Sequence, residues 1–154
     1  MTNPLKYTCL FGGGAIRGMA YIGTIRALEE LGIEYDIIGG SSVGAIIAAL
    51  VASGYKSYEL ENLFMKVNFD LFKDIHLGIG KAFAISKGEI FLDWLNELLL
   101  NKSENVRGKH ITFKDVDKQL VIITTNLTKF CTQEFSKAET PDFEVAQAIK
   151  ISSS

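Results

Sequence analysis

Two glycine-rich segments near the amino end of the chain carry the residues with the clearest chemical potential. The first is FGGGAIRG at Phe11–Gly18, and the second is GGSSVGA at Gly39–Ala45. In the second segment, Gly40 and Gly44 flank Ser42 in the pattern Gly-x-Ser-x-Gly. Between a strand and a helix, this pattern forms a sharp turn that presents the serine hydroxyl, and it needs tiny residues on both sides. The sequence therefore predicts a nucleophile elbow with Ser42 at its tip.

The first segment has a use that complements a serine nucleophile. Attack of a serine on an ester creates an oxyanion, which needs preorganised donors about 3 Å away. Backbone with little side chain, such as that of Gly13, Gly14 and Ala15, can aim several N–H groups at one point. We therefore expect an oxyanion hole here, completed by Arg17 and Gly18.

Other interpretations of the first segment fit less well. A dinucleotide fingerprint G-x-G-x-x-G that starts at Gly12 meets Arg17 where its last glycine should stand. A phosphate-binding loop needs a lysine after Gly18, and Met19 is there instead. A purely structural glycine turn stays open as an alternative, as does a bland glycine-rich turn at Ser42.

The elements around these segments follow a strand–helix–strand–helix order. We predict strands over 7–11 and 33–40, a helix over 17–31 that ends at Gly32, and a helix over 43–53, apolar on all sides, that ends at Gly54. Such alternation is typical of a parallel sheet with helices on both faces. The fold expected is α/β, a three-layer sandwich with a central, mostly parallel sheet.

The later part of the chain is predicted to continue this domain. The expected elements are a helix after Ser57, a helix that opens with the capping box Ser86 and Glu89, strands over 120–127 and 129–136, and a helix with Thr140 as its N-cap. The segment 72–85 mixes glycines and aromatic residues, which is compatible with a mobile cover, and we expect any peripheral membrane contact within 69–85. An ordinary core connection stays open as an alternative for this segment. No linker or repeat is visible, so residues 1–154 are predicted to form one domain.

Taken together, the two segments resemble those of the patatin-like phospholipase family. The resemblance rests on GGAIRG at Gly13–Gly18 and GGSSVGA at Gly39–Ala45, and more weakly on LVIITTNL and the closing AQAIKISSS. It implies a serine–aspartate dyad without histidine, a glycine-rich oxyanion hole, no cofactor or metal, and lipid acyl esters as substrates. Ala15 departs from the family, which usually has a third glycine at that position.

The aspartate of the implied dyad has no match in the chain. The family carries it in an Asp-Gly-Gly or Asp-Gly-Ala turn after the serine-rich helix, and this sequence contains no Asp-Gly. Its own aspartates are better explained by solvated or capping positions: Asp36, Asp70, Asp74, Asp93, Asp115, Asp117 and Asp142. His76 and His110 do not follow convincing strands, which disfavours a histidine triad. We expect the chain to be the amino-terminal part of a longer patatin-like protein.

Composition narrows the remaining functional classes. A net charge of −2 with mixed signs gives no basic footprint for nucleic acid. The two cysteines suggest no disulfide framework, which fits a reducing, cytoplasmic setting with at most peripheral contact with membranes. Alongside the hydrolase, two alternatives stay open: a non-catalytic lipid- or acyl-binding module of the same fold, and a Rossmann-like nucleotide binder.

Overall fold

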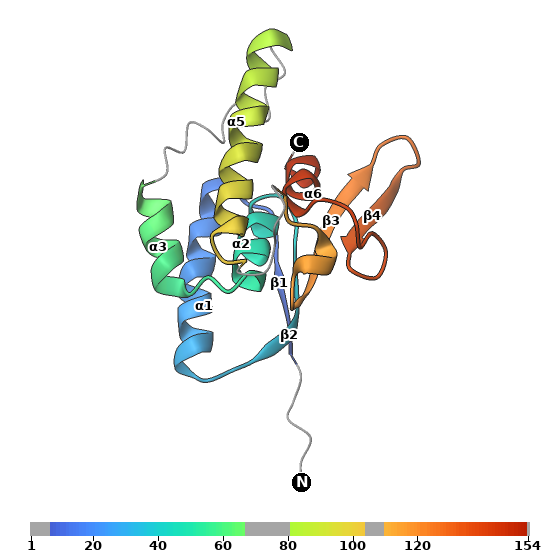
Figure 1. Cartoon of the computed structure of the whole chain (residues 1–154). Helices are drawn as coiled ribbons and strands as arrows, with labels where there is room; N and C mark the ends of the chain where they lie inside the picture. Colours follow the sequence, from blue (N-terminus) through green and yellow to red (C-terminus); the bar gives the residue numbers. More distant parts are fainter. Residues whose placement is uncertain (1–6, 67–80, 104–109, 154) are drawn as a thin grey trace.

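A four-stranded sheet forms the centre of the protein (Figure 1). The computed structural model describes residues 7–66, 81–103 and 110–153. The strands lie in the order β1 (Tyr7–Phe11), β2 (Tyr35–Gly40), β3 (Gln119–Asn126) and β4 (Cys131–Ser136). β1, β2 and β3 are parallel, and β4 pairs with β3 in an antiparallel hairpin. The predicted α/β class with a mostly parallel sheet is confirmed.

The helices connect these strands and follow them. A short 3₁₀ helix, η1 (Ala15–Met19), leads into α1 (Ala20–Glu30), and α2 (Val43–Ala52) follows β2. Between α2 and β3 lie α3 (Ser57–Lys66), α5 (Lys81–Leu100) and the short η2 (Phe113–Asp115). After β4 comes α6 (Val145–Ser152).

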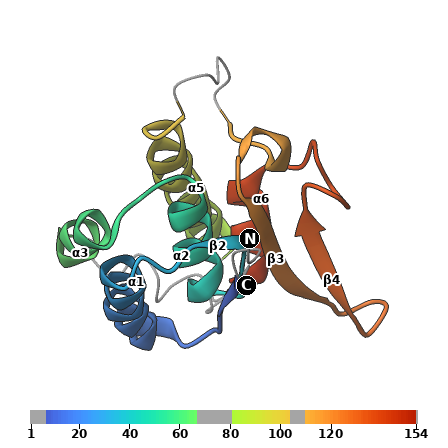
Figure 2. The ribbon, with the colours of Figure 1, turned by 90° about the horizontal axis from the view of Figure 1, so that it is seen from below.

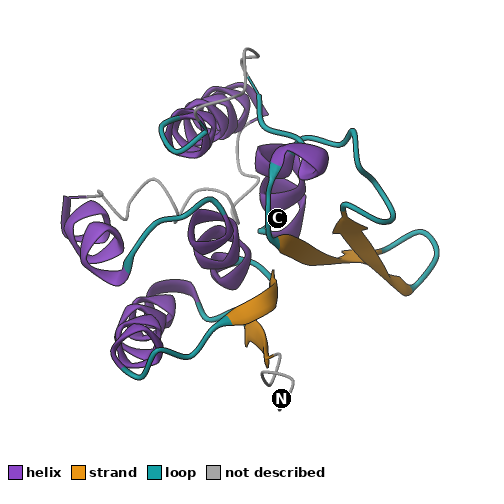
Figure 3. Ribbon diagram, turned by 60° about the horizontal axis from the view of Figure 1, so that its bottom comes forward, coloured by secondary structure: helices purple, strands orange, loops and turns teal. Residues whose placement is uncertain are grey.

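The described helices gather on one side of the sheet (Figures 2 and 3). Both α2 and α6 contact β3 and each other. Along β3, Leu120, Ile122 and Thr124 are buried, whereas Val121 and Ile123 between them are only partly buried. This alternation is expected of a strand with one face against a helical layer. A second helical layer is not among the described residues, so the three-layer arrangement stays a prediction.

Helix α2 is the centre of the hydrophobic core. Every residue from Gly44 to Ala52 is buried, because the helix packs on all three parallel strands and contacts α5 and α6. The sequence VGAIIAALVA has no polar face, and a helix that is apolar on all sides is expected to lie inside a protein. The predicted central helix is confirmed, and its position fixes the end of β2 against the core.

Two glycines end helices as predicted. Gly32, with φ 63°, follows α1, and Gly54, with φ 97°, follows α2. In each case the glycine and the next residue donate N–H groups back to the last helical turn; for α2 these bonds are Gly54 N–H to Val51 and Tyr55 N–H to Leu50. This is the Schellman pattern, in which a left-handed residue lets the chain turn away from the helix.

The predicted start of the long helix is wrong. The capping box at Ser86 and Glu89 implies a boundary there, but α5 begins at Lys81 and runs through both residues. A Ser-x-x-Glu pattern is also compatible with the interior of a helix, since serine has only a modest helix penalty. The segment 69–85 therefore ends in α5, and its residues 69–80 lie outside the described part.

The predicted start of the last helix is also wrong. α6 begins at Val145 with Glu144 as its N-cap, and not at Thr140. The Thr140 hydroxyl instead accepts the Ser136 N–H and donates to the Ser136 carbonyl, which closes the turn after β4. The chain then pairs with 111–114, where Val145 N–H donates to the Ile111 carbonyl. These long-range bonds hold the segment out of a helix.

Among the residues that the structure describes, no helix is both long enough and apolar enough to cross a membrane.

Candidate active site

The two glycine-rich segments meet at the carboxyl ends of β1 and β2. Phe11, the last residue of β1, is the register partner of Gly40, the last residue of β2. Because the strands are parallel, the loop after β1 and the turn after β2 start side by side. The Ser41 N–H donates to the Phe11 carbonyl at 3.2 Å and joins the two segments directly.

Ser42 has a backbone conformation that side chains rarely adopt. Its φ is 52° and its ψ is −127°, and it is the N-cap residue of α2. Non-glycine residues outside the common regions are strained and persist only where the surroundings hold them. The Ser42 side chain makes no capping hydrogen bond to the helix and is partly exposed. The predicted position of Ser42, between a parallel strand and a buried helix, is found.

The glycines on either side of Ser42 are required by close backbone contacts. A Cβ on Gly40 would lie 2.2 Å from the Gly44 carbonyl oxygen, and a Cβ on Gly44 would lie 2.1 Å from the Phe11 carbonyl oxygen. Neither distance is possible for a real side chain, and backbone cannot move aside as a flexible side chain can. The turn from β2 into α2 therefore needs glycine at both positions.

The loop after β1 lies against the turn that carries Ser42. A Cβ on Gly13 would be 3.4 Å from the Ser42 Cβ, so Gly13 is the loop residue that faces the serine. Gly14 has a φ of 174° and a ψ of 13°, and Ala15 has a φ of 48°. The Tyr21 hydroxyl supports the loop from α1 by donating to the Gly12 carbonyl at 3.1 Å.

The 3₁₀ helix η1 packs against the start of α2. A Cβ on Gly18 would lie 2.6 Å from a methyl carbon of Val43, the residue after Ser42. Gly18 is buried, whereas Arg17 is exposed and donates its backbone N–H to the Gly14 carbonyl. The motif GGAIRG thus forms one turn that covers the amino end of α2.

A third element reaches the site from the end of the described chain. The Ser152 hydroxyl, in the last turn of α6, accepts the Ser42 N–H at 2.9 Å and donates to the Ile123 carbonyl of β3 at 2.6 Å. The sequence alone did not indicate a role for Ser152. Its signal was the run of serines at the end of the predicted last helix, where a partly buried hydroxyl needs a polar partner.

Two of the described aspartates are held by other side chains, and a third lies at the far end of β2. Asp115 accepts the Thr112 N–H at 2.9 Å, and the Thr112 hydroxyl lowers its pKa, which makes it a weaker base. Asp142 pairs with the Lys114 amine at 2.6 Å. Asp36 lies near the start of β2, at the other end of the strand from Ser42.

The other described aspartates and His110 are exposed side chains on other elements. Asp93 on α5 and Asp117 before β3 are exposed, and Asp70, Asp74 and His76 lie outside the described residues. His110 is exposed, with its Nδ1 3.7 Å from a carboxylate oxygen of Glu144, at the amino end of α6. Ser152 is at the opposite end of that helix.

Cysteine nucleophilic catalysis and metal binding find no support among the described residues. Burial raises the pKa of the Cys9 thiol, so at neutral pH it is mostly the uncharged, weakly nucleophilic form. Over the residues that the structure describes, no group of three or more histidine, cysteine, aspartate or glutamate side chains is placed to hold a metal ion.

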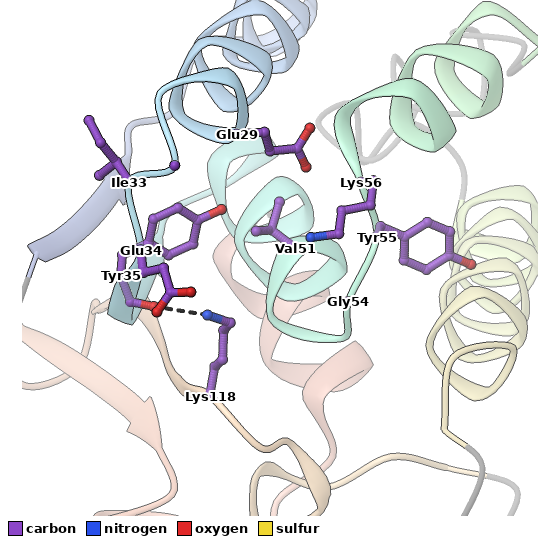
Figure 4. Close-up of a pocket in the computed structure, with 10 residues that line it drawn as sticks. Glu29, Ile33, Glu34, Tyr35, Val51, Gly54, Tyr55, Lys56 and Lys118 are labelled. Atoms are coloured by element: carbon purple, nitrogen blue, oxygen red, sulfur yellow. Dashed lines mark hydrogen bonds between the residues drawn. The ribbon is translucent and has the colours of Figure 1, made fainter.

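A pocket of about 390 Å³ lies at the opposite end of the parallel strands, beside the amino end of β2 (Figure 4). It is lined by Tyr35, which starts β2, and by Gly54, which follows α2. The Lys118 amine donates to the Tyr35 carbonyl at 2.9 Å within it. Because β2 separates Tyr35 from Ser42, this pocket is not part of the candidate site.

Comparison with known proteins places this geometry in a family. The model of the family described as patatin-like phospholipase matches residues 10–154. The chain belongs to the patatin-like phospholipase family. Its match begins next to the glycine-rich loop and includes the elbow, so the resemblance stated from the sequence is confirmed.

Two curated proteins illustrate the range of similarity to this chain. The uncharacterized protein R571 of Acanthamoeba polyphaga mimivirus is 30% identical over 97% of this chain and 52% of its own length. A lysophospholipase, NTE1 of Coccidioides immitis, is 60% identical over 43 residues, which are 28% of this chain and 3% of that protein. The chain thus spans about half the length of the mimivirus relative.

A solved structure has the same fold. ExoU, from the type III secretion system of Pseudomonas aeruginosa and solved in complex with SpcU, matches with a TM-score of 0.74 at 26% identity. The match covers 97% of this chain and 38% of ExoU. The patatin-like chain described here therefore corresponds to part of a larger protein in that case as well.

The glycine requirement at the patatin-like elbow gives a first prediction. Gly44→Ala should lower the free energy of unfolding by more than about 3 kcal/mol or prevent folding, because the new methyl group meets backbone. Gly23→Ala is the matched control, since a Cβ there meets nothing within 4 Å on α1, and it should stabilise by about 0.5–1 kcal/mol. Urea unfolding of both variants measures the difference, and equal stabilities would contradict the elbow geometry.

The strained alanine in the glycine-rich loop gives a second prediction. Ala15→Gly should raise the free energy of unfolding by about 1 kcal/mol, because glycine adopts a φ of 48° without a Cβ penalty. The matched control is Ala27→Gly, on the exposed face of α1, which should lower it by about 1 kcal/mol. If thermal and urea unfolding show both variants destabilised alike, Ala15 does not have this conformation.

Proposed function

We propose that this chain supplies the nucleophile and the oxyanion hole of a serine-dependent lipid acyl hydrolase. The observation that carries the proposal is the conformation of Ser42, with φ 52° and ψ −127° between β2 and α2. Strain of this kind clusters at functional sites, where the surrounding structure maintains it. Membership of a family named for phospholipases supports the same chemistry.

In the proposed reaction the Ser42 Oγ attacks the carbonyl carbon of an acyl ester while a base takes the hydroxyl proton. The carbonyl electrons move to oxygen, and the backbone N–H groups of Gly13, Gly14 and Ala15 stabilise the charge. The intermediate collapses, the ester C–O bond breaks, and the alcohol leaves with the proton. Water then attacks the acyl-Ser42 ester by the same steps, releases the fatty acid and restores the serine.

The base is proposed to be an aspartate outside these 154 residues. Asp115 and Asp142 are held by Thr112 and Lys114, and a serine hydroxyl is a weak nucleophile without an adjacent base. The chain covers 52% of the mimivirus relative and 38% of ExoU, so related proteins have room for a further segment. Residues 1–154 are therefore proposed as a single patatin-like domain that lacks the second member of its dyad.

The substrate class follows from the family and from one relative. A fungal relative is named a lysophospholipase, and acyl esters of lipids are the substrates that such a name describes. We propose a lipid acyl ester as the substrate here, met at a membrane surface by peripheral contact.

The roles of Arg17 and Gly18 are to shape the loop, since Gly18 lets η1 approach Val43.

One observation favours a second candidate, a non-catalytic lipid- or acyl-binding module. Ala15 has a left-handed φ at a position where the resemblance expects glycine, which is a strained fit for an oxyanion hole. Such a module would keep the glycine-rich loop and bind a lipid or acyl group without turnover. The two candidates differ in whether the Ser42 hydroxyl matters for ester cleavage.

The test is hydrolysis of p-nitrophenyl butyrate and of a lysophospholipid by the 154-residue chain and by the full-length protein. We expect the chain alone to be slow or inactive and the full-length protein to be faster by orders of magnitude. Residual rate in the chain would come from the oxyanion hole and binding alone. Ser42→Ala should abolish the activity of the full-length protein, and Ser41→Ala, one residue earlier, is the matched control.

Two outcomes would contradict the proposal. Equal activity with and without the Ser42 hydroxyl would reject the hydrolase and favour the binding module. Full activity in the 154-residue chain would show that the base lies inside it, which would overturn the proposed external aspartate.

A further inference from the structure

The end of α6 is hydrogen-bonded to the backbone of the proposed nucleophile. The Ser152 hydroxyl accepts the Ser42 N–H at 2.9 Å and donates its own proton to the Ile123 carbonyl at 2.6 Å. One hydroxyl thus links three elements: the elbow, the carboxyl-terminal half of β3, and the last turn of α6. The three residues are far apart in sequence, and Ser152 follows Ser42 by 110 positions.

We propose that Ser152 is a positioning residue for the Ser42 nucleophile. The inference rests on the hydrolase function proposed above and deepens it. Ser152 does not touch substrate in this account. It holds the backbone of Ser42 in the conformation that presents the hydroxyl, and it ties that backbone to the sheet and to α6.

The hydrogen-bond chemistry explains why a hydroxyl suits this position. The elbow offers a donor, the Ser42 N–H, and β3 offers an acceptor, the Ile123 carbonyl. A hydroxyl can accept from one and donate to the other at the same time, which an aliphatic side chain cannot do. Loss of the hydroxyl leaves both partly buried groups without this partner and releases one restraint on the strained residue.

The packing of α6 makes this link stiff. Val145, Ala146, Ala148 and Ile149 are buried, and α6 contacts β3, α2 and α5. Ser152 is therefore carried by a helix whose position is set by the core. A restraint from a packed helix can hold a catalytic group within the small error that efficient chemistry allows.

The same bond limits which amides can bind the oxyanion. The Ser42 N–H is committed to Ser152, so it is not a donor for the substrate. The proposed oxyanion donors are therefore confined to the amides of the glycine-rich loop, those of Gly13, Gly14 and Ala15.

The neighbouring serine provides a matched control. Ser153 is 5% exposed, and its hydroxyl has no hydrogen-bond partner among the described residues. Ser153→Ala removes the same atom from the same end of α6 without breaking the link to Ser42. Any effect of Ser152→Ala beyond that of Ser153→Ala is then due to the bridge.

The experiment uses the full-length protein and steady-state hydrolysis of p-nitrophenyl butyrate. Ser152→Ala should lower kcat by about 10- to 100-fold with KM within about 2-fold, because alignment is lost and binding is not. Ser153→Ala should leave both within about 2-fold, and Ser152→Thr, which keeps a hydroxyl, should recover most of kcat. Hydrogen exchange at the Ser42 amide should be faster in Ser152→Ala than in Ser153→Ala, a readout independent of activity.

The outcomes separate this inference from the proposed function. If Ser42→Ala abolishes hydrolysis but Ser152→Ala matches Ser153→Ala in both kcat and Ser42 amide exchange, Ser152 is not a positioning residue and the hydrolase stands. If Ser42→Ala leaves hydrolysis unchanged, the proposed function fails, and amide exchange alone then decides whether the bridge restrains the elbow. A loss of kcat in Ser152→Thr equal to that in Ser152→Ala would also overturn the role of the hydroxyl.

Discussion

The close approach of backbone to backbone at the turn after β2 is the constraint on which the rest of the site depends. A Cβ on Gly44 would lie 2.1 Å from the Phe11 carbonyl oxygen, and one on Gly40 would lie 2.2 Å from the Gly44 carbonyl oxygen. This contact lets the first turn of α2 lie directly against the end of β1. Ser42, the middle one of the three residues between these glycines, then has no room for a relaxed turn and takes a φ of 52°.

The other parts of the site follow from that contact. Because β1 and β2 are parallel neighbours, the loop that follows Phe11 lies beside Ser42, with Gly13 facing it. The core holds the arrangement from behind through α2, which is buried from Gly44 to Ala52. From the far end of the described chain, α6 adds the Ser152 hydroxyl. A strained residue is thus restrained from the loop, the helix and the sheet at once.

Local sequence was sufficient where the structure depends on local rules. The glycines around Ser42, the apolar run of α2 and the capping glycines Gly32 and Gly54 each impose a geometry that short patterns reveal. Local sequence was insufficient where contacts between distant segments decide the conformation. Thr140 has the features of an N-cap, but its hydroxyl closes the turn after β4 and the following residues pair with 111–114, so α6 begins only at Val145. The bond from Ser152 to Ser42 joins residues that no spacing rule connects.

The most direct test of the account is the site at which a fluorophosphonate reagent modifies the full-length protein. Such reagents phosphonylate an activated serine, with loss of fluoride, and leave ordinary serines unmodified, so they report on activation and not only on exposure. Peptide mass spectrometry is predicted to find a single adduct on Ser42, with none on Ser41 one residue before it. An unmodified Ser42 in a folded protein, or an adduct on a different serine, would contradict the central claim that this elbow carries the nucleophile.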